Sequence, residues 1–127
     1  MNYVDLVTIL ALLQFVFFAT LTALARGKYG VAAPAVTGND IFERTYRVQM
    51  NTLELLIVLL PSLYLAAKHW SPVYVACWGV VYLVGRFVYW RAYLRQPSSR
   101  TLGFQLSFGP VVVLLLAALI GTLRALF

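Results

Sequence analysis

The stretch NDIFERTYRVQMNTLELLIVLLP, from Asn39 to Pro61, decides the fold of this chain. It opens with helix-start chemistry, because Asn39 or Asp40 can accept hydrogen bonds from the free N–H groups of a first helical turn. It then becomes wholly apolar from Leu55 to Leu60. Four polar side chains precede that tract at spacings that place them on one stripe of a helix: Glu43, Arg47, Asn51 and Glu54. Ionisable groups on a helix that enters a membrane need partners or a ligand, so this stripe is the candidate functional centre.

The composition as a whole indicates an integral membrane protein. Of the 127 residues, 62% are hydrophobic and 11% are charged, against roughly 45–50% and about 25% in soluble domains. The length predicts a single domain over residues 1–127. The net charge of +6 comes from basic residues that flank apolar tracts, which argues against nucleic-acid binding. The one cysteine, Cys77, excludes an internal disulfide and a multi-cysteine metal site.

Apolar tracts of about 20 residues predict an all-α membrane protein, an antiparallel bundle of four transmembrane helices. The expected helices run from Leu6 to Ala25, from about Asp40 to Ala67, from about Val73 to Arg95 and from about Thr101 to Leu126. A signal peptide is the alternative for the first tract. Its start has no Lys or Arg, however, and the apolar run is longer than the ~7–15 residues of a signal. We therefore expect a retained helix.

The connections between these helices predict how the chain is oriented. The loop from Arg26 to Asn39 and the break from Gln96 to Ser99 lie beside most of the basic residues, which the positive-inside rule places in the cytoplasm. Lys68 to Pro72 forms a short turn on the other side. Pro110 is expected to kink the last helix, and Gly121 is expected to allow close packing.

A second polar stripe lies on the third predicted helix: Tyr82, Arg86, Tyr89, Trp90 and Tyr93. Arg86 lies about three turns inside the helix end, so we expect it to pair with a carboxylate. Only four are available in the chain: Asp5, Asp40, Glu43 and Glu54.

Both polar stripes fall at the predicted cytoplasmic end, and together they predict a basic, tyrosine-lined pocket open to cytosol and lipid. Arginines with one or two carboxylates and an amide suit a small zwitterionic or multiply anionic ligand. No Ser-His-Asp set, Cys-His pair, HExxH motif or glycine-rich phosphate loop is present. No metal site is predicted, and a nucleophile would have to come from the ligand.

The run FERxYRxQxNxxE from Phe42 to Glu54, followed by Arg86, Tyr89, Tyr93 and Arg100, resembles the MAPEG family. These are membrane-associated proteins in eicosanoid and glutathione metabolism, and the chain looks nearest to the leukotriene C synthase and microsomal glutathione transferase branch. The resemblance implies a homotrimer of four-helix bundles with glutathione bound between subunits. By position, it implies that one subunit holds glutathione through six residues: Arg47, Asn51, Glu54, Tyr89, Tyr93 and Arg100. Arg26 and Gln49 would reach in from the next subunit, and Arg100 matches the arginine that activates the thiol.

The function implied by this resemblance is that of a membrane-bound glutathione transferase. Its thiolate would attack a lipophilic electrophile from the membrane, and a glutathione peroxidase activity on lipid hydroperoxides would use the same thiolate. Leukotriene C synthase has an aromatic residue where this chain has Leu55, and arginines where it has Gly27 and Gly30, so we do not carry the eicosanoid substrate over. The alternative is a non-catalytic lipid-binding scaffold like the lipoxygenase-activating relative. A small transporter is disfavoured, because paired discontinuous segments are missing.

Overall fold

The computed structural model describes all residues, 1–127, and consists of four long α-helices and one short 3-10 helix. The elements are α1 (Asn2–Tyr29), α2 (Asp40–Ala67), α3 (Pro72–Arg95), η1 (Pro97–Ser99) and α4 (Thr101–Leu126). Each of the four α-helices is long and apolar enough to cross a membrane. The predicted all-α bundle of four membrane spans is therefore confirmed.

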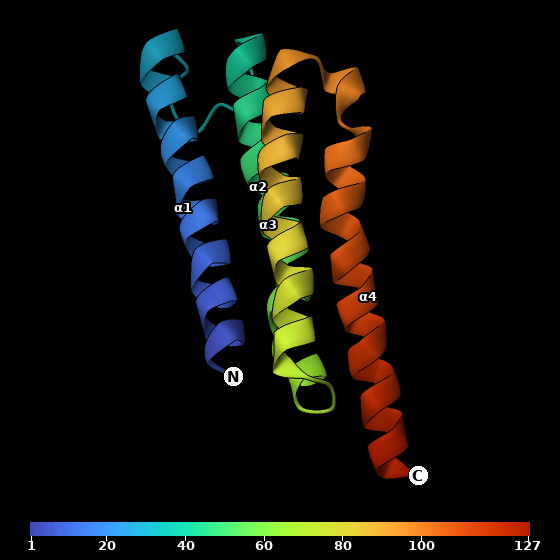
Figure 1. Cartoon of the computed structure of the whole chain (residues 1–127). Helices are drawn as coiled ribbons and strands as arrows, with labels where there is room; N and C mark the ends of the chain where they lie inside the picture. The colour runs from blue at the N-terminus through green and yellow to red at the C-terminus, as the bar shows by residue number, and fades with distance from the viewer.

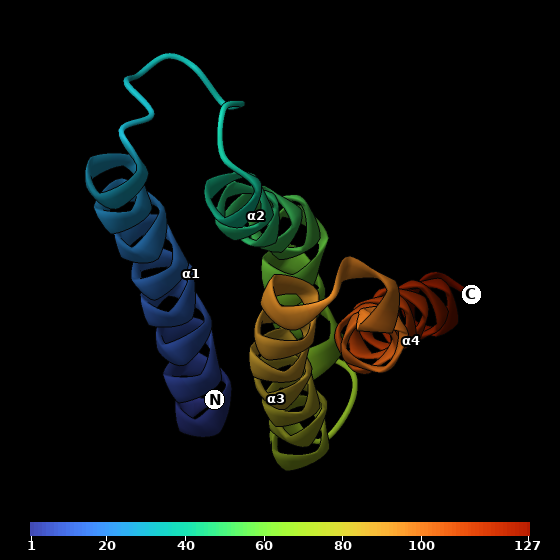
Figure 2. The same ribbon diagram turned by 90° about the horizontal axis from the view of Figure 1, so that it is seen from above.

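The helices run up and down as an antiparallel bundle (Figure 1). The α1–α2 loop and the α3–α4 connection lie at one end, and the tight α2–α3 turn lies at the other. Seen from above, α1 and α4 lie on opposite sides of the α2 and α3 pair (Figure 2). The two connections that carry most of the basic residues thus share one end of the bundle, which we call the polar end.

The start of α2 is fixed by the residues that the sequence singled out. Asn39 caps the helix, because its Oδ1 accepts a hydrogen bond from the N–H of Phe42 at 3.0 Å. The carboxylate of Glu43 accepts a hydrogen bond from the N–H of Gly38 at 3.1 Å, which ties the preceding loop to the first turn. The polar stripe of α2 therefore begins at the polar end of the bundle.

The first helix is longer than predicted. It was expected to end at Ala25 with a loop from Arg26, but α1 continues through Gly27 to Tyr29. A glycine inside a helix lowers helix stability by only about 1 kcal/mol relative to alanine, so the long helix can continue through it. The helix ends where Gly30 adopts φ 68°, a left-handed conformation that terminates helices.

Helices α3 and α4 pack so closely that their backbones meet at glycines. A Cβ added to Gly85 would lie 2.6 Å from the carbonyl carbon of Leu106, and one added to Gly103 would overlap the backbone of Tyr89. At the other end, a Cβ on Gly121 would lie 2.5 Å from that of His69, which confirms the close packing expected there. The two glycines nearest the polar end bring α4 directly against the polar stripe of α3.

Candidate functional site

A cavity of about 350 Å3 lies at the polar end, between α2, α3 and α4. Its volume is within the range of small-molecule sites, roughly 300–1,000 Å3. It is lined by Arg47, Asn51, Tyr89, Tyr93, Arg100 and Phe104. We call it the polar pocket. Five of its six lining residues are ones that the sequence predicted, and these five come from α2, from α3 and from Arg100 directly before α4.

Arg86 forms the floor of this region and is completely buried, with 0% of its surface exposed. Its Nη1 donates to Oδ1 of Asn51 at 2.8 Å and to Oγ1 of Thr52 at 3.2 Å. Its Nε donates to Oγ of Ser107 at 2.9 Å. The guanidinium also lies over the ring of Tyr89, 4.4 Å from the centroid. One arginine thus connects α2, α3 and α4 immediately behind the polar pocket.

The prediction that Arg86 pairs with a carboxylate is wrong. All three of its hydrogen-bond acceptors are neutral oxygens, from Asn51, Thr52 and Ser107. Thr52 and Ser107 remain satisfied as donors, because each hydroxyl also bonds to the backbone carbonyl four residues earlier. These neutral acceptors and the aromatic face stabilise the guanidinium without a second buried charge, whose desolvation would be expensive; its Nη2 has no hydrogen-bond partner within the chain.

The tyrosines of the pocket form one wall. Tyr89 and Tyr93 are stacked, with ring centroids 5.4 Å apart and an interplanar angle of 11°. Phe104 from α4 lies 6.5 Å from Tyr89 in a tilted arrangement. Tyr89 is buried between its neighbours. Because Arg86 supports its inner face, the ring has a fixed position at the back of the cavity.

Arg100 enters the polar pocket from the start of α4. The turn before it is held by Ser99, whose hydroxyl bonds to the carbonyls of Ala92 at 3.0 Å and Gln96 at 2.7 Å. No side chain caps the first turn of α4. The free N–H groups and the helix dipole therefore add to the positive potential of the exposed Arg100 guanidinium. This corner of the pocket favours an anion.

A second cavity of about 320 Å3 shares Arg47 and Tyr93 with the polar pocket. It adds Asp40, Glu43 and Arg44 to the lining. The polar pocket itself holds no carboxylate, so this neighbouring cavity is the acidic part of the region. A ligand that extends across Arg47 would meet cationic groups in one cavity and mixed charges in the other.

Three of the predicted site residues lie outside the polar pocket: Arg26, Gln49 and Glu54. Arg26 is occupied within its own chain, donating to the carbonyl of Ala35 at 2.6 Å and packing over the ring of Phe42 at 4.8 Å. Gln49 is half-buried, and Glu54 is exposed on α2. A single chain therefore assembles five of the eight predicted residues and leaves the other three turned elsewhere.

Sequence reasoning missed Phe104, Thr52 and Ser107. Phe104 gave no signal, since an aromatic residue in an apolar helix is ordinary. Thr52 and Ser107 did give one, because small hydroxyl residues inside membrane helices commonly hydrogen-bond across helices. Reading Ser107 together with Arg86 would have identified the neutral partners.

Comparison with known proteins agrees with this architecture. The model of the MAPEG family matches residues 4–120. Human microsomal glutathione S-transferase 2 is 37% identical over 115 residues, covering 91% of this chain and 78% of that protein. An uncharacterized Synechocystis protein is 41% identical over 118 residues, 93% of this chain and 86% of its own. Leukotriene C4 synthase of Cavia porcellus is 32% identical over 117 residues, 92% and 78% of the two chains. The chain belongs to the MAPEG family.

Proposed function

We propose that this protein is a membrane-bound glutathione transferase, with glutathione held in the polar pocket as co-substrate. The observation that carries the proposal is the convergence of Arg47 and Arg100 with Asn51 and two tyrosines on one cavity. Glutathione has two carboxylates, an ammonium group and a thiol. Arginine forks pair with carboxylates, and the acidic side chains next to Arg47 suit the ammonium group. The related microsomal glutathione S-transferases support the same reaction class.

Arg100 is the proposed catalytic residue. A free thiol with a pKa near 8.5 is only about 3% thiolate at pH 7. A cation within a few ångströms favours the thiolate, and a shift of about two pKa units would raise its fraction roughly 25-fold. The thiol proton leaves to solvent. The sulfur then forms a bond to an electrophilic carbon of a lipophilic substrate, whose leaving group departs with its electron pair. With a lipid hydroperoxide, the thiolate would instead attack an oxygen of the O–O bond, which breaks and releases the lipid alcohol after protonation. A second glutathione would then reduce the resulting sulfenic acid, giving glutathione disulfide and water.

The proposed assembly is a homotrimer with its polar end in the cytoplasm. Its support is the placement of Glu54, an exposed carboxylate on a membrane helix, and of Gln49 and Arg26 away from their own chain's pocket. Charged groups on a membrane face are expensive without partners. A neighbouring subunit would supply those partners and would let Arg26 and Gln49 reach the next pocket.

Titration of the detergent-solubilised protein with glutathione tests the binding site, and thiolate absorbance near ~240 nm tests the mechanism. Arg100→Ala should lower turnover of a model electrophile about tenfold or more and change glutathione affinity only modestly, because thiolate stabilisation acts on the chemical step. The pH at which bound glutathione ionises should rise. Turnover and the pH of ionisation in Arg100→Lys should lie between those of wild type and Arg100→Ala, since lysine keeps the charge without the guanidinium fork. Ionisation at the same pH in wild type and Arg100→Ala would remove Arg100 as activator and favour the non-catalytic scaffold.

A further inference from the structure

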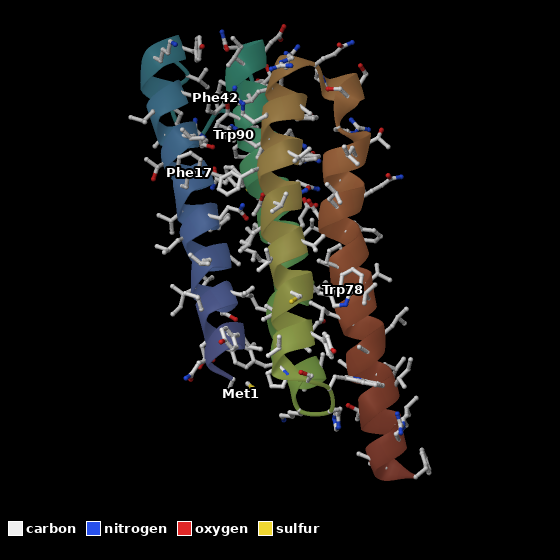
Figure 3. The ribbon with its side chains drawn as sticks, in the orientation of Figure 1. Met1, Phe17, Phe42, Trp78 and Trp90 are labelled. Atoms are coloured by element: carbon white, nitrogen blue, oxygen red, sulfur yellow. The ribbon has the colours of Figure 1, made fainter.

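An apolar groove lies between the first half of α3 and the second half of α4, far from the polar pocket. Its volume is about 410 Å3, and nine of its ten lining residues are hydrophobic. Three of them are aromatic: Trp70, Tyr74 and Trp78. Trp78 projects from α3 toward α4 (Figure 3). We call this cavity the α3–α4 groove. Its shape and lining suit a hydrocarbon chain.

A basic cavity adjoins the groove at the helix ends. Its volume is about 300 Å3, and its lining includes His69, Trp70 and Arg124. Trp70 lines both cavities and is the wall between them. Its Nε1–H donates to the carbonyl of Ala117 at 2.8 Å, and the guanidinium of Arg124 lies over its ring at 5.8 Å. The junction between the apolar and basic cavities is therefore a fixed feature.

The charge around this junction has one sign. Arg124 lines the basic cavity, and Lys68 directly precedes His69, which also lines it. Both basic side chains are exposed, and neither makes a hydrogen bond to a carboxylate. Of the four acidic residues, three lie on α2 between Asp40 and Glu54, away from the α2–α3 turn. The fourth, Asp5, accepts a hydrogen bond from Tyr64 at 2.8 Å and belongs to α1, on the other side of the bundle (Figures 1 and 2). Among side chains, an occupant of the junction would therefore meet positive charge and no carboxylate.

The order of the two cavities along α4 matches that of an amphiphile in a bilayer. The groove extends from Val113 to Ile120, which is about 10 Å of helix at 1.5 Å per residue. Arg124 lies about one turn farther toward the helix end, where the α2–α3 turn is also found (Figure 1). The apolar part thus lies within the span and the basic part at its surface.

We propose that the α3–α4 groove and the basic cavity together bind one anionic phospholipid of the bilayer. An acyl chain packs against Trp78, and the phosphate lies at Arg124, whose guanidinium fork suits a phosphate. A second basic residue, Lys68, and a cavity of headgroup size favour a phospholipid over a free fatty acid. This site is independent of glutathione binding.

The tryptophan fluorescence of the chain reports directly on the groove, because two of the three tryptophans line it. Trp90→Phe removes the third tryptophan. Trp90 packs on Phe17 of α1, so this position should tolerate another aromatic ring. This variant is placed in vesicles of four parts phosphatidylcholine and one part phosphatidylglycerol. Bromine, which quenches tryptophan fluorescence on contact, is carried on the acyl chains of one lipid or the other.

Per labelled molecule, phosphatidylglycerol should quench about fivefold more strongly than phosphatidylcholine, which corresponds to about 1 kcal/mol for one basic residue at a membrane surface. Arg124→Gln should abolish the preference. Arg91→Gln is the matched control, because Arg91 is also an exposed arginine over the aromatic ring of residue 90, at 5.5 Å in the wild type, but at the opposite end of the bundle. It should leave the preference intact. High salt should weaken the preference in the protein that retains Arg124, which tests the charge effect without a folding risk.

Three results would overturn the proposal. Equal quenching by both labels would mean that ordinary lipid solvates the groove without selection. No quenching by either label would mean that a second copy or another segment covers it. Equally strong quenching by a brominated fatty acid at the same mole fraction in phosphatidylcholine would assign the site to a free carboxylate instead.

Discussion

Arg86→Met should separate the stability of the bundle from the affinity of its pocket. Methionine has nearly the length of arginine and fills the same space without a charge. The variant removes the only hydrogen bond of Asn51 Oδ1 and the cation under the Tyr89 ring. Both of these side chains line the polar pocket. They become mobile in the free protein, so glutathione must order them when it binds.

The size of this effect follows from the number of side chains released. Immobilising a side chain on binding costs about 0.5–1.5 kcal/mol, so two side chains should weaken glutathione affinity by about 1–3 kcal/mol, or roughly 5- to 150-fold. The free energy of unfolding should change much less. Lost hydrogen bonds are offset because a buried charge is no longer desolvated, and such replacements are often neutral or stabilising.

Calorimetric titration with glutathione and thermal unfolding in the same detergent measure the two quantities. Ser107→Ala is the matched control, since it removes one contact of Arg86 but none to a pocket residue. It should lower stability by about 1 kcal/mol and change affinity less than about threefold. If Arg86→Met binds glutathione within twofold of wild type while still folded, Arg86 does not order the pocket and the reasoning fails.

Three further outcomes are expected. Gly103→Ala should lower the free energy of unfolding by about 1–3 kcal/mol, because its Cβ would overlap the backbone of α3, whereas Gly109→Ala meets nothing within 4 Å and should not destabilise; equal melting temperatures would contradict the close contact. Glu54→Ala should weaken glutathione binding by about 1–2 kcal/mol, because a charged group of glutathione or of the proposed neighbouring subunit is left unpaired; unchanged affinity in a protein whose assembly is intact would remove Glu54 from the site. Mixing Arg100→Ala subunits with Arg26→Ala subunits should give more activity than either variant alone, because certain interfaces of the proposed assembly then carry neither substitution. No recovery despite proven mixing would count against a shared site.

The parts of the fold that depend on local chemistry could be predicted from sequence. Asn39 and the residues after it fix the start of α2 within the chain itself, and the predicted bounds of α2 and α4 match the structure. The end of α1 could not be placed, because Gly27 and Gly30 are the same residue type. Only the second adopts a left-handed conformation, and the sequence carries no sign of which one would.

The candidate site was predictable where one helix determines it and unpredictable where three helices meet. Spacing alone put Arg47 and Asn51 on one face of α2. The partner of Arg86 on α4, Ser107, depends on the register between α3 and α4, which Gly85 and Gly103 set through a close contact. Its partners Asn51 and Thr52 depend on how α2 packs against α3. That register has no local signature. A search for opposite charges therefore selected carboxylates over Thr52 and Ser107.

The neutral surroundings of Arg86 also determine how the protein should respond to acid. Each of its acceptors is an amide or hydroxyl oxygen, and none of these gains a proton as the pH falls through the range in which proteins are handled. Acid therefore does not change the protonation state of these acceptors. The acid side of a pH–rate profile should report the ionisation of the molecules that enter the pocket and of the groups at its rim, because the wall behind them keeps its hydrogen bonds.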